Sequence, residues 1–352
     1  MTAAQKNNMH HLTKEQEKIF LTFANLLANK EEGTASHLAF LKEDSNHGQT
    51  GGLDLWADAV KIKDFPVNRE SRIVSNVNIV QDFTRALQED ITERNAARKI
   101  SFVEIGPGLW ESVRIKTVPY IEALKDSSTP VSHYISIDPS SECAKPAAKG
   151  IKDLYPHMKT SAQVSSFEDA KVGSKNLTSV AILWGPTIWN TGISSELDPE
   201  LVLASQLKSV KQVVNSGGYI LSTYYSSDNR EKDDISYNDP RNLKLVQSLA
   251  HSIEHRLDDT NFKADNFQPY VEYKGNGLGR YSMGIESKID QTVNLNHSVS
   301  REFKIGERMG LVNSWRLKEQ KLYNIVSTAG ADMICHSYDK DIGAGMFLAR
   351  FR

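Results

Sequence analysis

The chain is poor in cysteine and has no long apolar run. Only Cys143 and Cys335 occur among its 352 residues, too few for a disulfide framework and without the paired spacing of a zinc site. No stretch approaches the roughly 18 consecutive apolar residues of a membrane-spanning helix, and the polar residues 1–12 lack the apolar centre of an export signal. We therefore expect a protein of a reducing compartment, the cytoplasm, with no membrane partner.

The sequence also lacks an excess of charge of either sign. Its 42 Lys and Arg residues are balanced by 44 Asp and Glu residues, so nothing favours nucleic acid as a partner. Hydrophobic residues make up 39% of the chain and charged residues 24%, which is typical of a folded globular protein. A small molecule is the expected partner, and the length favours a core domain with a second lobe.

From residue 100 onward, short apolar runs alternate with helical segments. This pattern predicts an α/β fold, a parallel sheet with crossover helices. The predicted strands are residues 100–105, 134–137, 180–183 and 219–222, with a shorter one at 163–165. The predicted helices are residues 14–30, 74–95, 199–214, 242–256 and 318–328.

The texture of the sequence changes again after Tyr237. Residues 270–273 and 280–289 predict antiparallel strands of an inserted lobe, and residues 346–349 predict the edge strand of the main sheet. We expect four parts: an N-terminal helical part of a lid lobe (1–80), a core (81–234), an inserted α+β substrate lobe (235–314) and a C-terminal helix and strand that complete the core (315–352).

A glycine turn follows the first predicted strand of the sheet. The segment Glu104-Ile-Gly106-Pro-Gly108 lets the backbone approach a ligand more closely than any side chain would allow. The next strand ends in Asp138, whose carboxylate can accept both hydrogen bonds of a ribose diol. A purely structural turn and, for Asp138, a capping role before the next helix are the alternatives.

The same loop distinguishes between two nucleotide-type ligands. A third glycine three positions after Gly108 would suit a dinucleotide, but Glu111 stands there, and a carboxylate repels pyrophosphate. S-adenosylmethionine (SAM) has a sulfonium and an amine and no phosphate, so it suits a loop that contains Glu104 and Glu111. The sequence predicts SAM as the cofactor, with a nicotinamide-dependent oxidoreductase as a weak rival.

Several motifs in order give the chain a family resemblance over roughly residues 50–352. It resembles the histidine Nα-methyltransferases of ergothioneine biosynthesis and their fungal amine-methylating relatives. The motifs are Val103-Glu-Ile-Gly-Pro-Gly108, Tyr134-Ile-Ser-Ile-Asp138, Leu183-Trp-Gly-Pro-Thr-Ile-Trp-Asn190, Ser236-Tyr-Asn-Asp239, and Gly306-Glu-Arg-Met with Asn313-Ser314. The resemblance implies a Rossmann-like class I methyltransferase sheet with a second, smaller α+β lid lobe.

The resemblance also implies roles for individual residues. Gly106, Asp138 and Phe167 match positions that line the donor site, with Gly185 at the end of the fourth strand. Two further matches, Asn190 and Tyr237, correspond to positions that hold the carboxylate of an amino-acid substrate, and Ser314 to one near its side chain. From the residues alone, a turn or cap role for Asn190 and a core role for Tyr237 remain the alternatives.

The chain departs from the family pattern at several positions. The family's loop reads Gly-Ser-Gly followed by a lysine. In this chain no lysine follows Gly108 directly, and Arg114 is the residue expected to bind the carboxylate of the methyl donor. The acidic residue that meets adenine corresponds to Ser166, for which Glu168 or Asp169 are alternatives. A tyrosine on the substrate side corresponds to Phe65.

The departure with the largest consequence is Val312, which stands where the family has a glutamate facing the imidazole of histidine. Valine cannot accept a hydrogen bond, and leaving a buried N–H unpaired costs about 1 to 3 kcal/mol. A less polar side chain would suit Val312, Met283 and Trp315 better. We therefore expect transfer of a methyl group to the amine of an amino acid or related small molecule other than histidine, with Tyr237 or Asp239 orienting the amine or relaying its proton.

Other interpretations are kept as alternatives. A SAM-binding regulatory protein without turnover would also retain the donor motifs, and an O- or C-methyltransferase would differ only in the bond formed. His251 and His255 share one helix face, but no third metal ligand is apparent. Four aromatic residues at predicted strand ends favour a cage around a cation over ordinary packing: Trp184, Trp189, Tyr224 and Tyr225.

Overall fold

The computed structural model describes residues 14–28, 31–33, 35, 52–94, 99–170, 172, 176–185, 187–190, 192–194, 198–214, 217–257, 260–275, 278–295 and 299–352. They belong to two compact units. The minor unit comprises Met1–Ile62, Asn190–Leu197 and Asp234–Trp315, and the sheet unit comprises Lys63–Trp189, Asp198–Asp233 and Arg316–Arg352.

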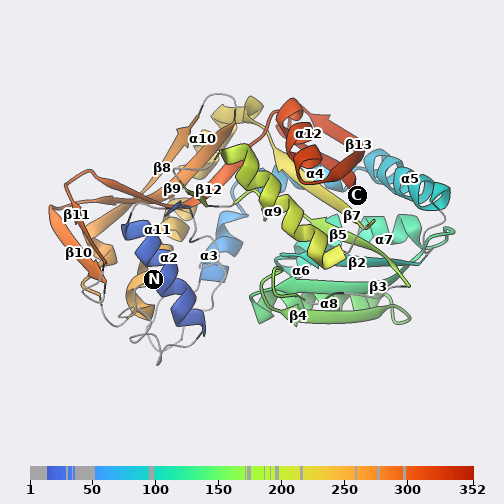
Figure 1. Cartoon of the computed structure of the whole chain (residues 1–352), viewed down its shortest axis with the longest axis horizontal. Coiled ribbons are helices and arrows are strands. Elements are labelled where there is room, and N and C mark those ends of the chain that lie inside the picture. The colour runs from blue at the N-terminus through green and yellow to red at the C-terminus, as the bar shows by residue number, and fades with distance from the viewer. Residues whose placement is uncertain are drawn as a thin grey trace. The chain divides into compact units, whose positions relative to one another are not determined.

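The sheet unit is built on a seven-stranded sheet in the order β13-β14-β7-β5-β2-β3-β4 (Figure 1). Its strands are β2 (Ile100–Ile105), β3 (Val131–Asp138), β4 (Lys159–Val164), β5 (Thr178–Leu183), β7 (Tyr219–Tyr225), β13 (Ala331–Asp339) and β14 (Ala344–Phe351). The central pairings are parallel, whereas β14 pairs antiparallel with both β7 and β13. The carboxyl ends of β2, β3, β4, β5 and β7 therefore lie along one edge of the sheet, which is where open α/β sheets bind ligands.

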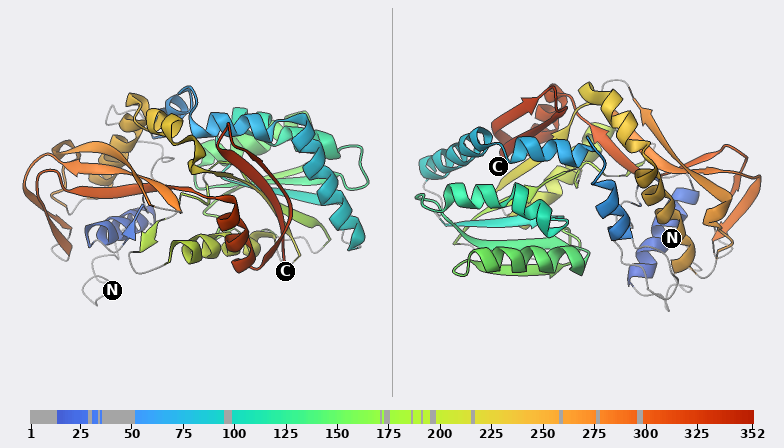
Figure 2. Two further views of the ribbon diagram at one scale, coloured as in Figure 1. Left: turned by 90° about the horizontal axis from the view of Figure 1, so that it is seen from above. Right: turned by 180° about the vertical axis from the view of Figure 1, so that it is seen from behind.

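Helices cover both faces of this sheet. They are α4 (Pro66–Val74), α5 (Val77–Glu93), α6 (Trp110–Lys116), α7 (Val118–Leu124), α8 (Ser141–Leu154), α9 (Pro199–Val214) and α12 (Glu319–Thr328). Figure 2 shows α4 and α5 on the face opposite α9 and α12. Because both faces are covered, β2, β5 and β7 are buried along their whole length, which explains their continuous apolar runs.

The predicted strands of the main sheet are confirmed, and the predicted Rossmann-like α/β fold with them. The helix predicted over residues 74–95 is confirmed as α5, which begins only at Val77 because Asn76 caps it by accepting hydrogen bonds from the backbone N–H groups of Asn78 and Ile79. The prediction that residues 346–349 form an edge strand is wrong. They lie in β14, between β7 and β13, and β13 has too mixed a polar and apolar sequence to show a strand pattern.

The minor unit contains helices α2 (Lys14–Leu27), α3 (Gly52–Ala59) and α11 (Pro240–Arg256) and a three-stranded sheet. That sheet has the order β12-β9-β8, made by β8 (Phe267–Lys274), β9 (Gly279–Ser287) and β12 (Arg308–Arg316), and a separate hairpin pairs β10 (Gln291–Leu295) with β11 (Val299–Phe303). The predicted antiparallel strands are thus confirmed. Short β1 (Glu31–Glu32) pairs with β6 (Ile193–Ser194).

The boundary expected at residue 80 differs from the one in the structure. Residues 63–80 belong to the sheet unit because α4 packs against β14, β7 and α6. Helix α10 (Arg230–Tyr237) contains another boundary, between Asp233 and Asp234. Among the helices in the described part of the chain, none combines the length and apolar character needed to cross a membrane.

Candidate functional site

The glycine turn after β2 has the backbone geometry that only glycine adopts readily. Gly106 has φ 65° and Gly108 φ 66°, in the left-handed region. A Cβ on Gly106 would lie 2.9 Å from Cγ2 of Thr187, whereas a Cβ on Gly108 would meet no atom within 4 Å. Open space therefore lies in front of Gly108, as a donor that approaches the backbone requires.

Asp138 is the last residue of β3 and is 5% exposed. Its Oδ1 accepts a hydrogen bond from the backbone N–H of Ser140 at 2.8 Å, the only one its carboxylate receives from the described residues. Burial raises the pKa of Asp138 to about 6. The carboxylate can cap this turn and still bind a ribose hydroxyl, so the two predicted roles are compatible.

The turn after β4 lies beside Asp138, because the backbone N–H of Ser165 donates to the carbonyl of Asp138 at 3.2 Å. Ser166 donates its hydroxyl hydrogen to Oδ2 of Asp169 at 2.9 Å, and Phe167 is half-buried. Of the two acidic alternatives to Ser166, the structure thus links Asp169 to it by a hydrogen bond.

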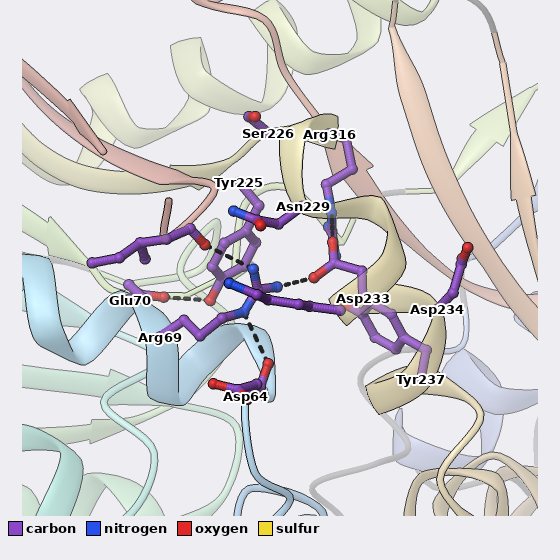
Figure 3. Close-up of polar contacts among 12 residues, drawn as sticks. Asp64, Arg69, Glu70, Tyr225, Ser226, Asn229, Asp233, Asp234, Tyr237 and Arg316 are labelled. Carbon is purple, nitrogen blue, oxygen red and sulfur yellow. Dashed lines mark hydrogen bonds and ion pairs between the residues drawn. The ribbon is translucent and has the colours of Figure 1, made fainter. Parts of the chain in front are cut away.

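Gly185 follows β5 and Trp184 and has φ 72°. Its backbone N–H is bound by the carboxylate of Glu70, a residue that the sequence analysis did not identify. This N–H donates to Oε1 of Glu70 at 2.8 Å and to Oγ1 of Thr223 at 2.9 Å. Glu70 is fully buried and also pairs with Lys116 Nζ at 3.1 Å and accepts from the hydroxyl of Tyr225 (Figure 3). The N–H of Gly185 is therefore used within the protein.

That Arg114 binds the donor carboxylate stays a prediction. Arg114 lies on the exposed face of α6, whereas Lys116, two residues further on, is 2% exposed and pairs with Glu70, the residue that accepts from the N–H of Gly185. Residues two apart on a helix point in directions about 200° apart, so only one of them can face the sheet.

Glu104 belongs to a buried network and not to an acidic loop surface. It accepts hydrogen bonds from Tyr134 at 2.6 Å and from Thr117 at 2.8 Å, and Thr117 accepts one from the indole of Trp184 at 2.7 Å. Burial raises the pKa of Glu104 to about 7. Because Trp184 precedes Gly185 and Glu104 precedes Gly106, this network joins the two glycine turns.

The predicted aromatic cage is not supported. All four of its rings are at most 5% exposed and contact other protein groups: Trp184, Trp189, Tyr224 and Tyr225. The cation near these rings is Arg316, whose guanidinium lies 5.2 Å from the ring centroid of Tyr225. These residues pack the interior, as β7 and β5 are covered on both faces.

In the minor unit, several of the predicted substrate residues come together. The hydroxyl of Tyr237 lies 3.1 Å from Oγ of Ser314. Asn242 Nδ2 donates to the carbonyl oxygen of Tyr237 at 2.7 Å and lies 3.9 Å from Sδ of Met283. Val312 is 7% exposed on β12, two residues before Ser314.

Three other predictions fare differently. Asn190 is half-buried at the start of a segment of the minor unit, whereas Phe65 lies in the sheet unit, 3% exposed, directly before α4. The proposed proton relay by Asp239 is not supported, because Asp239 caps α11, and both its carboxylate oxygens accept hydrogen bonds from Arg241. Arg241 also lowers the pKa of Asp239, which makes it a weaker base.

The histidine pair does not form a metal site in the described residues. The rings of His251 and His255 stack with centroids 6.2 Å apart, and His251 Nε2 lies 3.8 Å from Asp265. Within the described ranges, no three His, Cys, Asp or Glu residues are grouped as a metal ion would require.

Comparison with known proteins gives one extensive match. A family model described as histidine-specific, SAM-dependent methyltransferase matches residues 49–350. No match was found among curated proteins.

Solved structures of SAM-dependent methyltransferases also resemble the chain. Magnesium protoporphyrin IX methyltransferase from Synechocystis PCC 6803, with bound S-adenosylhomocysteine (SAH), has 8% identity and a TM-score of 0.41, covering 86% of this chain and 94% of that one. An N1-methyltransferase of 1,6-didemethyltoxoflavin from Burkholderia thailandensis has 8% identity and a TM-score of 0.39, covering 77% and 78%. A methyltransferase from Clostridium acetobutylicum ATCC 824 has 14% identity and a TM-score of 0.38, covering 76% and 90%. Similarity at this level carries no argument about the substrate.

Proposed function

The chain belongs to the family of histidine-specific, SAM-dependent methyltransferases, and from that premise we propose that it methylates the amine of an amino acid or related small molecule other than histidine. The observation that carries the proposal is the pair Tyr237–Ser314 with Val312 beside it. Tyr237 and Ser314 supply hydroxyl groups that can bind a carboxylate or an amine. Val312 supplies no hydrogen-bond acceptor for an imidazole.

The donor residues suit SAM. The positive φ of Gly106 and Gly108 and the open space in front of Gly108 allow the ligand to approach the backbone. The carboxylate of Asp138 can accept hydrogen bonds from ribose hydroxyls, and the ring of Phe167 can pack against adenine. When bound, SAM supplies the methyl group, which passes in line from sulfur to the amine nitrogen.

The chain itself supplies positioning in this reaction. The amine nitrogen must present its lone pair as the carbon–sulfur bond breaks, and it then loses a proton. Tyr237 can orient the amine through its hydroxyl, since that hydroxyl both donates and accepts. The carboxylate of Asp239 caps α11 and pairs with Arg241, which makes it a weak base, so water is the simplest proton acceptor.

The test is a panel of free amino acids, including histidine, and of biogenic amines, each incubated with SAM and enzyme and analysed by mass spectrometry. Histidine should turn over about ten- to a hundredfold less efficiently than the best acceptor, which corresponds to a lost charged hydrogen bond of about 1.5 to 3 kcal/mol. Val312→Glu should shift activity toward histidine, and Val312→Ile, which keeps the site apolar, should not.

The panel also separates the alternatives. Highest turnover of histidine by the natural enzyme would show that Val312 does not face the acceptor side chain. Calorimetric binding of SAM without methylation of any compound would favour a regulatory SAM-binding protein. Fragmentation that locates the new methyl group on oxygen or carbon would replace N-methylation by the corresponding reaction.

A further inference from the structure

Two consecutive residues of α4, Arg69 and Glu70, are both buried in the sheet unit, at 3% and 0% exposure. Each holds a separate group of partners, and Figure 3 shows Asp233 beside Arg69 and Tyr225 beside Glu70. Charged side chains are rarely buried to this degree unless they are paired, so the partners of each residue show what it organises.

Glu70 organises the donor side. Its carboxylate joins the backbone N–H of Gly185 beyond β5, the hydroxyl of Tyr225 at the end of β7 and the ammonium of Lys116 at the end of α6. Gly185 has φ 72°, and a hydrogen bond to its N–H fixes the orientation of this peptide. The position of the glycine turn therefore depends on Glu70, together with Thr223, whose Oγ1 accepts from the same N–H at 2.9 Å.

Arg69 organises a second group around Asp233. Arg69 donates to Oδ1 of Asp233, and Arg316 donates from Nε to Oδ2 of the same carboxylate at 2.7 Å. The other guanidinium hydrogens of Arg69 bind the backbone carbonyls of Asp64, from Nε at 2.8 Å, and Ile342, from Nη1 at 2.7 Å. The three side chains of this triad are at most 3% exposed.

The triad lies on the two segments that lead to the Tyr237–Ser314 pair. Asp233 is four residues, about one helical turn, before Tyr237 on α10, and Arg316 follows Ser314 by two residues on β12. The next residue of α10, Asp234, accepts a hydrogen bond from Tyr281 at 2.7 Å, and the ring of Tyr281 lies 4.6 Å from that of Tyr237. Two neighbouring residues of α10 therefore influence the orientation of Tyr237: Asp233 through the helix that both residues share, and Asp234 through Tyr281.

We propose that Arg69 and Glu70 are positioning residues for methyl transfer: Glu70 positions the donor turn at Gly185, and Arg69 positions Tyr237 and Ser314 through Asp233. The acceptor half rests on the function proposed above, whereas the donor half rests only on SAM binding. Stability alone is a weak explanation for these groups, because buried ion pairs can often be replaced by apolar residues without loss of stability.

The test compares Glu70→Gln with Arg69→Met. Glu70→Gln retains an acceptor for Gly185 but removes the charge opposite Lys116, and SAH binding measured by calorimetry should weaken about tenfold. Arg69→Met leaves Asp233 and Arg316 as a matched pair. It should leave SAH affinity within about twofold while hydrogen–deuterium exchange of residues 230–237 accelerates, and the KM of the best acceptor in the panel should rise more than kcat falls.

Arg350→Met is the matched control. Arg350 pairs with Asp90 at 2.6 Å and Asp332 at 3.0 Å in the same unit, but at the amino end of β7, opposite Tyr219. It should lower the thermal midpoint without changing SAH affinity or exchange in α10. If Glu70→Gln does not fold, Tyr225→Phe replaces it, with an expected loss of about threefold in SAH affinity. If Arg69→Met does not fold, Arg69→Lys replaces it, and hydrogen–deuterium exchange in α10 should again be faster than in the natural protein.

The outcomes decide between positioning and stability. The proposal would be overturned if the Arg69 and Glu70 variants lowered the thermal midpoint as Arg350→Met does but left SAH affinity and hydrogen–deuterium exchange in α10 unchanged. Neither readout needs an acceptor. A panel in which no compound is methylated would therefore refute the proposed function, while calorimetry and exchange would still decide the roles of Glu70 and Arg69.

Discussion

Asp138 offers the sharpest test of the donor site, because its position, its hydrogen bond and its pKa are all defined. Asp138→Ala removes the carboxylate and with it charge-assisted hydrogen bonds to the ribose, worth about 1.5 to 3 kcal/mol. SAH affinity at pH 7.5 should fall about ten- to a hundredfold in calorimetry. Asp138→Asn keeps one acceptor oxygen for the N–H of Ser140 and turns the other oxygen into an NH2 group that can only donate to a ribose oxygen, so the loss should be smaller, about three- to tenfold.

The pKa adds a second arm to this experiment. Burial raises the pKa of Asp138 to about 6, so at pH 7.5 the carboxylate is charged and at pH 5 it is mostly protonated. The affinity of the natural enzyme should fall as the pH falls through 6, and the difference from Asp138→Asn should shrink to within about twofold at pH 5.

The same pKa separates binding from folding. A carboxyl group whose pKa is raised in the folded state favours folding most below its unfolded pKa, and this contribution is lost as the pH rises from about 4 to about 6. Asp138→Asn should therefore be at least as stable as the natural protein at pH 7.5, while binding SAH more weakly. Unchanged affinity of Asp138→Ala at pH 7.5 would remove Asp138 from the donor site, and a pH-independent difference from Asp138→Asn would show that charge is not the cause.

Two further predictions concern the same edge of the sheet. Glu104→Gln removes a buried carboxyl group whose pKa is raised from 4.5 to about 7, so it should match the natural protein in stability near pH 4 and exceed it by about 3 kcal/mol near pH 8. A difference in stability that does not grow between these pH values would contradict the assigned cause. Gly106→Ala should abolish measurable SAH binding, because its Cβ would lie 2.9 Å from Thr187 at a positive φ. The control is Gly217→Ala, at φ 79° with no atom within 4 Å of the added Cβ, which should cost about 1 to 2 kcal/mol of stability and leave SAH binding intact. Equal effects of the two glycine changes on binding would refute a specific role for the turn.

The parts of the candidate donor site that the sequence could predict are those with a local signature. Gly106 and Asp138 follow directly from buried strands, and the end of a parallel strand fixes where the next residues lie. The cap at Asp239 also had a local signature, since an Asp followed by Pro240 at the start of a helical segment is typical of a helix N-terminus. Weighing that signature would have favoured a capping role for Asp239 over a proton relay.

Lys116 could have been found from periodicity. Val113, Lys116, Thr117 and Tyr120 are all buried, and their spacing of three, four and seven positions marks one face of a helical segment. Arg114 falls outside that face. The spacing therefore indicates that Lys116 is buried. Residue type alone does not, because a lysine is usually interpreted as an exposed side chain.

Glu70 and Arg69 have no such local signal. Lys116 lies 46 positions from Glu70 along the chain, and Asp233 lies 164 positions from Arg69, so only the tertiary fold brings the charges together. A charged dipeptide on a short helix is usually solvated, but both of these residues are buried, since burial becomes tolerable once each charge has a partner. Because apolar residues could fill the same space at similar stability, the cost of keeping these charges buried is better explained by the peptide and side-chain orientations that they impose on Gly185 and Asp233.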